Sequence, residues 1–435
     1  MKEKFIVKGL GGKKILSGKI KINGAKNAIL PTMAASILFK DGFELNNIPN
    51  IEDVKRMSEL LGCLGSEVSK KSENKYLINS KGLNKFDLDR KISEQMRASI
   101  ILTGPLLARF GQVSFPVPGG CVIGARPIDF FVAGFKKMGA ETKFKNDRYY
   151  ISTKNKKLNG AKIFFKTPSV TATETFIMAG VLAKGKTILK NVALEPEIDN
   201  LINFLVSCGA KIKGGGTTTI EIVGGTLLEA KGKKYIAMPD RIETGSFLIL
   251  GALCAKDLEI TNCNPNDIDI LIEILKDSGV PIKVGKTSIK IEKNDKINNS
   301  QFKGSGIKTK EYPGFPTDLQ APMVIFLTQT TGESLVFETI FEGRLNFIED
   351  ITRMGADIIL LDPHRAIVRG PKDLRARELE SPDIRAGLAF VIATILAKGE
   401  SVINNIYLID RGYERIEERL IKIGVDIKRI SSEEI

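Results

Sequence analysis

One pattern, a helix that ends in glycine and leads into a strand, repeats six times along this chain. In each copy an amphipathic helix stops at a glycine and a strand starts at once; the six glycines are Gly65, Gly139, Gly209, Gly279, Gly355 and Gly424. A helix commonly ends with a residue at positive φ, which glycine adopts without steric cost. The spacing of roughly 70 residues exceeds the usual solenoid period, so we expect compact α/β units.

Each copy is preceded by a second shared piece, an apolar helix that leads through a turn into a strand. The clearest examples are residues 175–192, 244–263 and 387–405. Helices that are apolar all round are buried inside proteins. We therefore predict that each unit has the element order helix–strand–helix–strand–strand, and that the six units form two groups of three.

This arrangement predicts an α/β fold with two inside-out, barrel-like α/β domains and a cleft between them. Each domain would hold three repeated helix-strand units, with its buried helices inside and its sheets outside. We expect the first domain to span residues 22–237 and the second to combine residues 1–21 with 238–435.

The composition excludes several classes of protein. The five cysteines form no CxxC pair, which disfavours a disulfide framework or a zinc site and fits a reducing cytoplasm. The single histidine, His364, excludes a histidine-rich metal site and reads as a residue in a turn between strands. No long apolar run or leader-like N-terminus is present, so we expect no membrane insertion.

The net charge of +14 is compatible with nucleic acid, an anionic surface or small anionic substrates. The lysines are dispersed along the chain, and no nucleic-acid-binding motif or basic tail accompanies them. Part of this charge is ordinary solvated surface, and the remainder can attract anionic substrates.

The least ordinary segment is PVPGGCVIGARPIDFF, residues 116–131, which contains Cys121. Its glycines permit close approach of a ligand, and Arg126 would favour the reactive thiolate. The alternative interpretation is a buried structural cysteine, which is the usual fate of a free cysteine. The other four cysteines lie in helical, strand or turn patterns, and we interpret them as packing residues.

Polar or charged clusters begin the buried helix of every unit. The clusters are Lys26-Asn27, Met96-Arg97, Ser169-Val170-Thr171, Asp240-Arg241, Thr317-Asp318 and Pro382-Asp383-Ile384-Arg385. Helix N-termini bind anions, and equivalent ends of repeated units gather on one side of a domain. Such sides would suit a substrate rich in phosphate and carboxylate, with an aspartate as general base. The alternative is that these residues are only helix caps.

Taken together, these segments resemble the UDP-N-acetylglucosamine enolpyruvyl transferases of the EPSP synthase/enolpyruvyl transferase family. The resemblance covers essentially the whole chain through the motifs GAKNA, QMRASI, PGGCVIGARPID, PSVTATE, PDRIETG, FPTDLQA, ETIFEGR, DIRAG and DRGYERIE. It implies transfer of the enolpyruvyl (carboxyvinyl) group of phosphoenolpyruvate to the 3'-hydroxyl of UDP-N-acetylglucosamine by addition–elimination, with release of phosphate. This reaction is the first committed step of peptidoglycan synthesis and needs no metal or organic cofactor.

The resemblance also implies roles for individual residues. Cys121 would protonate the methylene carbon, form a covalent adduct and react with the epoxide fosfomycin, and Asp318 would accept the proton of the sugar hydroxyl. Asp383 and Arg385 would support catalysis. The residues expected to bind phosphoenolpyruvate are Lys26, Asn27, Arg126 and Arg411. Those expected to bind UDP-N-acetylglucosamine are Arg97, Arg126, Pro127, Ile128, Asp129, Phe130, Ser169, Val170, Asp318 and Ile340.

Thr171 departs from the family, which usually has glycine at this position near the nucleotide. Three alternatives stay open: the enolpyruvyl transferase of the shikimate pathway, a basic nucleic-acid-binding repeat protein, and an inactive homologue. The PGGC and GAKNA motifs disfavour the first, and the absence of tryptophan and of an aromatic stacking platform disfavours the second. The third is disfavoured because every charged site position is present. We expect a cytoplasmic monomer whose partners are the two small-molecule substrates.

Overall fold

The computed structural model describes residues 3–119, 123–124 and 128–431. The chain divides into two compact units. Unit 1 comprises Met1–Asn23, Val122–Ala125 and Pro239–Ile435, and unit 2 comprises Gly24–Cys121 and Arg126–Met238. Each unit has its own continuous hydrophobic core. None of the described helices is both long and apolar enough to cross a membrane.

Unit 2 contains three described sheets. In the spatial order of their strands, they are β13 (Lys234–Ile236), β3 (Phe43–Asn46), β5 (Lys75–Asn79) and β4 (Glu67–Ser72); β6 (Gln112–Pro116), β8 (Arg148–Thr153) and β7 (Ala140–Lys145); and β11 (Lys211–Lys213), β12 (Thr219–Val223), β10 (Lys186–Lys190) and β9 (Lys162–Phe164). The helices of this unit are α1 (Lys26–Ala35), α2 (Glu52–Leu64), α3 (Arg90–Ser93), α4 (Thr103–Phe110), α5 (Asp129–Lys137), α6 (Val170–Val181) and α7 (Pro196–Ser207).

Unit 1 likewise contains three described sheets. They are β15 (Ile282–Val284), β16 (Ser288–Ile291), β14 (Ala255–Thr261) and β2 (Leu16–Lys21); β17 (Ile307–Lys308), β18 (Gly332–Phe337), β20 (Arg365–Gly370) and β19 (Asp357–Asp362); and β21 (Glu378–Glu380), β22 (Glu400–Asn404), β1 (Glu3–Lys8) and β23 (Asp426–Ser431). Its helices are α8 (Arg241–Cys254), α9 (Asp269–Asp277), α10 (Gln320–Leu327), α11 (Ile348–Arg353), α12 (Ile384–Leu396), α13 (Tyr407–Asp410) and α14 (Ile416–Ile421).

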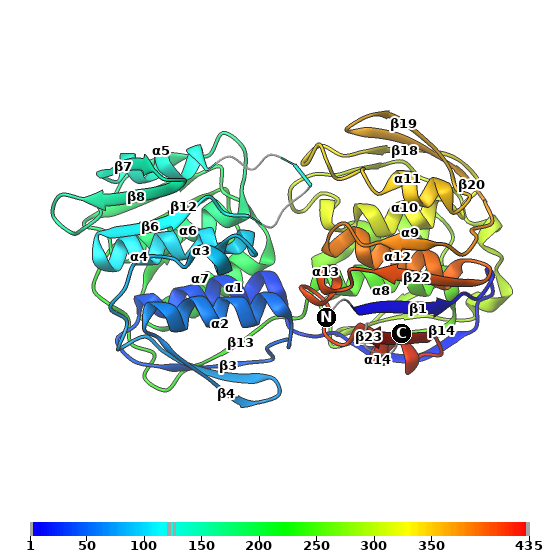
Figure 1. Cartoon of the computed structure of the whole chain (residues 1–435), viewed down its shortest axis with the longest axis horizontal. Coiled ribbons are helices and arrows are strands. Elements are labelled where there is room, and N and C mark those ends of the chain that lie inside the picture. Colours follow the sequence, from blue (N-terminus) through cyan, green and yellow to red (C-terminus); the bar gives the residue numbers. More distant parts are fainter. Residues whose placement is uncertain (1–2, 120–122, 125–127, 432–435) are drawn as a thin grey trace. The chain divides into compact units, whose positions relative to one another are not determined.

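The predicted inside-out α/β arrangement is confirmed within each unit. Every residue of α8 and α10 is buried, and these two helices and α12 all contact one another. Figure 1 shows strands of different sheets on opposite sides of these helices in unit 1. The repeat order is also confirmed, for example as α8–β14–α9–β15–β16. The described sheets of each unit do not close into a barrel.

The six repeat glycines adopt the backbone conformation that the sequence predicts. Their φ angles are +102° at Gly65, +88° at Gly139, +103° at Gly209, +101° at Gly279, +112° at Gly355 and +103° at Gly424. Each glycine reverses the chain between an amphipathic helix and the next strand. A residue with a Cβ atom would be strained at all six positions.

Each unit is completed by a strand from outside its run of repeats. β2 pairs in parallel with β14 of unit 1, and β13 pairs in parallel with β3 of unit 2. The N-terminal β1 lies between β22 and β23 and is antiparallel to both. β2 and β13 are thus edge strands of their sheets, whereas β1 is paired on both sides.

Candidate active site

The starts of two buried helices of unit 1 bring Asp318 and Arg385 together, and Arg344 reaches Asp318 from the turn before α11. Asp318 lies in the short 3-10 helix (Thr317–Leu319) that leads into α10, and Arg385 is in the first turn of α12. Asp318 Oδ2 lies 3.0 Å from Arg385 Nε and 2.9 Å from Arg385 Nη2. Its other oxygen, Oδ1, lies 2.5 Å from Arg344 Nη2. Both carboxylate oxygens are therefore held by guanidinium groups, which favour the charged form of a carboxylate.

Arg385 is anchored on its other side by an aromatic hydroxyl. Its Nη1 donates to the Tyr413 hydroxyl oxygen at 2.9 Å in a fully buried setting. Burial alone lowers the pKa of the Arg385 guanidinium, but Asp318, Tyr413 and Asp240 together raise it above its ordinary value. Burial raises the pKa of Tyr413 to about 12. Arg385 therefore stays charged, and Tyr413 fixes its orientation.

Asp383 has a local structural role in addition to the catalytic role expected from the sequence. It is the N-cap of α12, and its Oδ1 accepts from the backbone N–H groups of Arg385 at 2.7 Å and Ala386 at 3.1 Å. Arg344 Nη1 lies 3.9 Å from the same oxygen. Asp383 thus orients the helix turn that carries Arg385, as an N-cap aspartate does.

Glu338 organises the loop that contains Ile340 and was not singled out from the sequence. It is fully buried, and its Oε1 accepts from the Ile340 N–H at 2.8 Å and the Phe341 N–H at 3.2 Å. Its carboxylate also accepts from the hydroxyl groups of Thr309 at 3.0 Å and Thr317 at 2.9 Å. The Glu338 carboxylate therefore holds the backbone of the loop at Ile340 in place.

Arg344 is the second residue of the cluster that sequence reasoning missed. Only 3% of its side chain is exposed, and its Nε donates to the Thr317 hydroxyl at 3.2 Å. Arg344 is the last residue of the ETIFEGR motif, so the motif contained a signal that could have identified it. Its approach to Asp318, however, is a tertiary contact. Arg411 is also buried, at 7% exposure, and follows α13 in the segment that carries Tyr413.

In unit 2, Lys26 is held at the start of a buried helix by an aspartate. Lys26 is the first residue of α1, and its Nζ lies 2.9 Å from Asp53 Oδ2. The side chains of Lys26 and Asp53 are 13% and 3% exposed. Lys26 and Asn27 are the first two residues of α1 and stand at its N-terminal end. A cation at the N-terminus of a helix is the kind of site that phosphate and carboxylate occupy.

Arg97 and Ser169 begin two further elements that contact α1. Arg97 starts the 3-10 helix Arg97–Leu102, and its Nη1 donates to the Pro118 carbonyl oxygen at 3.1 Å. Ser169 is the N-cap of α6, and its hydroxyl oxygen accepts from the Ala172 N–H at 3.4 Å. Val170 is the first residue of α6. The 3-10 helix, α1 and α6 contact one another, so the structure brings these elements together in unit 2.

The segment after the cysteine loop is only partly described. Ile128 is buried, Asp129 is exposed at the start of α5, and Phe130 packs against Phe165 and Phe176 with ring centroids 4.8 and 5.9 Å apart. Cys121, Arg126 and Pro127 lie outside the described residues. Ile123 and Gly124 belong to unit 1, where the Gly343 N–H donates to the Ile123 carbonyl oxygen at 2.9 Å.

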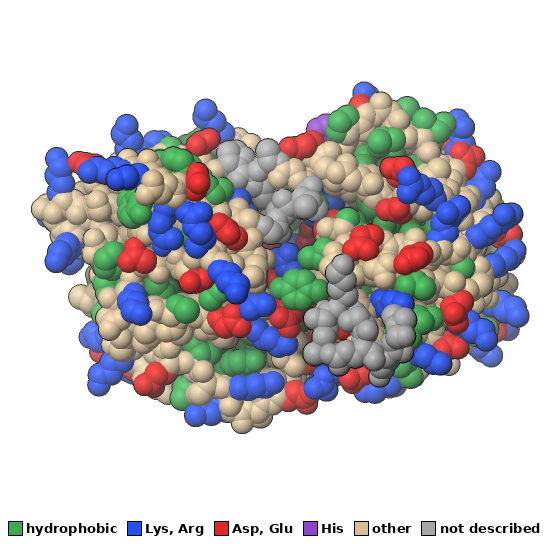
Figure 2. Space-filling view, viewed as in Figure 1, with side chains coloured by type: hydrophobic (Ala, Val, Ile, Leu, Met, Phe, Trp, Pro, Cys, Tyr) green, Lys and Arg blue, Asp and Glu red, His purple; other side chains and the backbone are tan. Residues whose placement is uncertain are grey.

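The positive charge is spread over the visible surface of each unit. On the face shown in Figure 2, Lys and Arg side chains alternate with Asp, Glu and uncharged residues in both units. Many lysines of the described chain have carboxylate partners, such as Lys186 with Glu221 at 2.8 Å. This pattern differs from the continuous basic face that nucleic-acid binding requires.

His364 lies in the predicted turn, between β19 and β20. Its Nδ1 is 2.8 Å from the Glu338 carbonyl oxygen. It therefore ties that turn to the end of β18, and the prediction of a turn residue is confirmed.

Comparison with known proteins identifies relatives along nearly the whole chain. Residues 10–420 match the EPSP synthase (3-phosphoshikimate 1-carboxyvinyltransferase) family. The UDP-N-acetylglucosamine 1-carboxyvinyltransferase of Koribacter versatilis is 40% identical over 98% of this chain and 96% of its own length. The protein of the same name from Thermodesulfovibrio yellowstonii is 41% identical over 95% of this chain and 97% of its own.

Solved structures share the fold at low sequence identity. The enolpyruvyl transferase NikO from Streptomyces tendae superposes with a TM-score of 0.87 at 19% identity and covers 99% of both chains. EPSP synthase from Acinetobacter baumannii gives a TM-score of 0.72 at 17% identity, covering 99% of this chain and 100% of its own. The architecture of this chain is therefore that of known enolpyruvyl-transferring proteins.

Proposed function

This chain belongs to the EPSP synthase family, and on that premise we propose that it is a UDP-N-acetylglucosamine 1-carboxyvinyltransferase. It transfers the enolpyruvyl group of phosphoenolpyruvate to the 3'-hydroxyl of UDP-N-acetylglucosamine and releases phosphate, the first committed step of peptidoglycan synthesis. We choose UDP-N-acetylglucosamine as the acceptor because relatives that are about 40% identical to this chain over nearly full length share this enzyme name.

Asp318 acts as the general base in this mechanism. Its carboxylate takes the proton of the sugar 3'-hydroxyl while that oxygen forms a bond to C2 of phosphoenolpyruvate and C3 receives a proton from the Cys121 thiol. Elimination then returns one C3 proton to the Cys121 thiolate and breaks the C2–O bond to phosphate, which restores the double bond and the thiol. The ion pairs from Arg385 and Arg344 support this role because they hold the Asp318 carboxylate charged and oriented.

The substrate anions are bound by separate groups of residues. Phosphoenolpyruvate is held by Lys26, Asn27, Arg126 and Arg411, and the buried Lys26–Asp53 pair supports this assignment by fixing the ammonium group. UDP-N-acetylglucosamine is held by Arg97, Arg126, Pro127, Ile128, Asp129, Phe130, Ser169, Val170, Asp318 and Ile340. Asp383 and Arg385 position the general base, which agrees with their hydrogen bonds within the first turn of α12.

The decisive experiment measures phosphate release from phosphoenolpyruvate by the full chain with each of two acceptors. UDP-N-acetylglucosamine is expected to support release, and shikimate 3-phosphate is not. Release with shikimate 3-phosphate alone would assign the chain to the other branch of the family. Release with neither acceptor would contradict the proposed reaction.

Fosfomycin separates the role of the cysteine from the reaction as a whole. We expect the epoxide to abolish phosphate release and to add its mass to the peptide that contains Cys121. A Cys63→Ser variant, which changes an exposed cysteine elsewhere in unit 2, is the matched control and should stay sensitive. Release that persists after complete treatment would keep the reaction but remove Cys121 from it.

We also propose that the enzyme works as a monomer in the cytoplasm, without nucleic-acid or membrane partners. The four described cysteines are all free thiols, which supports a reducing compartment. Sedimentation at the concentration of the activity assay tests the monomer, since a dimer would double the mass.

A further inference from the structure

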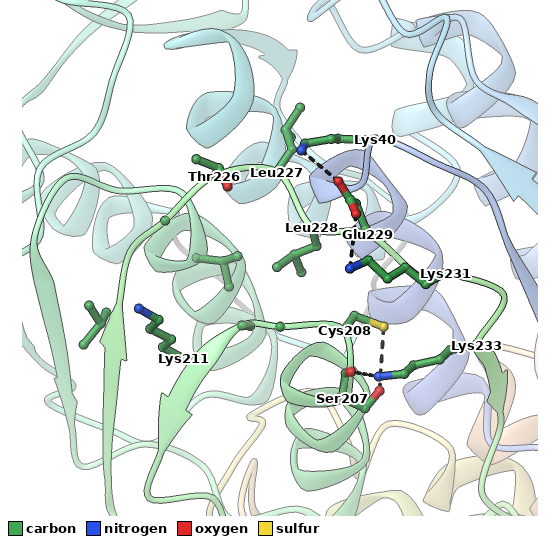
Figure 3. Close-up of a pocket in the computed structure, with 15 residues that line it drawn as sticks. Lys40, Ser207, Cys208, Lys211, Thr226, Leu227, Leu228, Glu229, Lys231 and Lys233 are labelled. Atoms are coloured by element: carbon green, nitrogen blue, oxygen red, sulfur yellow. Dashed lines mark hydrogen bonds and ion pairs between the residues drawn. The ribbon is translucent and has the colours of Figure 1, made fainter.

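An open groove of about 500 Å³ lies in unit 2 beside the end of α7 (Figure 3). Its size falls in the range of small-molecule sites, about 300–1,000 Å³. Four lysines and one carboxylate contribute to its lining: Lys40, Lys211, Lys231, Lys233 and Glu229. The groove therefore carries an excess of positive charge that the proposed reaction does not use.

The local structure presents these lysines from three different chain segments. Lys40 follows α1 and its 3-10 extension, and its Nζ lies 2.9 Å from Glu229 Oε1. Lys231 Nζ lies 3.6 Å from Glu229 Oε2, so one carboxylate stands between two ammonium groups. Lys233 donates to the Ser207 carbonyl oxygen at the end of α7. Lys211, at the start of β11, is exposed and makes no ion pair among the residues that the structure describes.

The rest of the lining is apolar or uncharged. Val181, Leu228 and Cys208 supply apolar surface, and Thr226 supplies a hydroxyl group. Cys208 is only 7% exposed, and burial raises the pKa of its thiol. A cationic rim over a partly apolar lining fits an anion that also has a nonpolar portion.

The groove is remote from the substrate residues proposed for unit 2. Val181 is the last residue of α6, whose N-cap is Ser169, and Lys40 lies beyond the end of α1, which begins at Lys26. At 1.5 Å per residue, these two helices separate the groove from those starts by about 15–18 Å. A ligand in the groove would therefore occupy a second site.

We propose that this groove binds a small phosphorylated metabolite that carries a diphosphate group, of the nucleoside diphosphate class. The diphosphate takes the place that Glu229 now holds between Lys40 and Lys231. Lysine ammonium groups are compact charges that suit phosphate oxygens. The apolar lining receives the organic part of the metabolite.

Calorimetric titration of the full chain with inorganic pyrophosphate tests the charge requirement. We expect the double variant Lys40→Gln/Lys231→Gln to bind pyrophosphate at this site at least about tenfold more weakly than the wild type. The matched control is Lys143→Gln/Lys145→Gln, which removes two exposed charges from β7 in the same unit. Equal affinity in both double variants, or no pyrophosphate binding at all, overturns the proposal.

Two native cysteines show whether the pyrophosphate lies in the groove. Cys208 lines the groove, whereas Cys63 is exposed on α2 and does not. At mildly alkaline pH, pyrophosphate should slow alkylation of Cys208 in the wild type and in the β7 control but leave alkylation of Cys63 unchanged. Protection of Cys208 that persists in Lys40→Gln/Lys231→Gln, or protection of neither thiol in any variant, contradicts the assignment.

Discussion

Arg385 contacts Asp318 through two of its nitrogens, Nε at 3.0 Å and Nη2 at 2.9 Å, and both reach the same oxygen, Oδ2. The two residues are 67 positions apart in the chain. Arg344 holds the remaining oxygen, so the proposed general base is oriented by two guanidinium groups that are nearly buried. The effect of an Asp318 substitution on activity should therefore be distinguishable from a loss of folding, because many other contacts stabilise the first turns of these helices.

We predict that Asp318→Asn lowers kcat by about 10²–10⁴-fold, because an amide cannot accept the proton of the sugar hydroxyl. Phosphate release at saturating concentrations of both substrates measures this change, and the melting temperature monitors folding. Asp362→Asn is the control, since Asp362 also pairs with an arginine, Arg365 at 2.7 Å, on a sheet of the same unit. Retention of more than about a tenth of the wild-type kcat in folded Asp318→Asn would rule out the assigned role.

We predict that Lys26→Gln raises KM for phosphoenolpyruvate at least about tenfold, because a charge-assisted contact with a substrate anion is lost. The Kd for UDP-N-acetylglucosamine, measured by calorimetry, should stay near its wild-type value. Lys19→Gln is the matched control, because Lys19 pairs with Glu259 but is 74% exposed. A parallel loss of affinity for both substrates would indicate a structural role for Lys26.

Glu174 provides a prediction about pH and stability. Burial, followed by the nearby carboxylates of Glu197 and Glu195, raises the pKa of this side chain well above its ordinary value. The folded state therefore binds a proton that the unfolded chain releases above about pH 4.3. The stability from Glu174 is present below that pH and is lost as the pH rises toward the folded-state pKa.

Glu174→Gln should remove this dependence. We expect the melting temperature of the wild type to fall relative to that of Glu174→Gln as the pH is raised from about 5 to 8. Glu141→Gln is the control, since Glu141 is 64% exposed on β7. A difference between the wild type and Glu174→Gln that is constant across this range would show that Glu174 is ionised in the folded protein.

Two helical glycines of unit 2 should respond oppositely to alanine. A Cβ atom at Gly62 in α2 would meet nothing within 4 Å, so Gly62→Ala should stabilise by about 0.5–1 kcal/mol. A Cβ at Gly134 in α5 would lie 2.1 Å from the ring of Phe176, which is fully buried, so Gly134→Ala should destabilise by about 1–3 kcal/mol. Thermal unfolding of both variants checks the signs, and a stable Gly134→Ala would show that the Phe176 ring can move.

Much of the fold could be predicted because the governing signals are local. The glycines at the helix ends, such as Gly209 and Gly355, report a positive φ that each helix–strand junction needs by itself. The apolar composition of helices such as α8 and α12 is sufficient to predict that these helices are buried. The family motifs then pointed to Lys26, Asp318 and Arg385 without any knowledge of their contacts.

The residues that sequence reasoning missed act through contacts between distant segments. Arg344 reaches Asp318 across 26 positions, and Glu338 binds Thr309 across 29 positions. Nothing in the residues around Glu338 indicates that a fully buried carboxylate collects two hydroxyl and two backbone donors there. Asp53 was missed in the same way, as the partner of Lys26 from the next helix.

The sequence by itself determined the six repeats, the buried character of their first helices and the backbone reversal at each repeat glycine, because each depends on residues close together in the chain. Only the tertiary structure decided that β2 pairs with β14, that β13 pairs with β3, and that β1 lies between β22 and β23. The same holds for the two arginines on Asp318. Strand pairing and ion pairing of this kind depend on which segments the packed cores bring within hydrogen-bonding distance. The spacing of residues within a short segment does not indicate which segments these are.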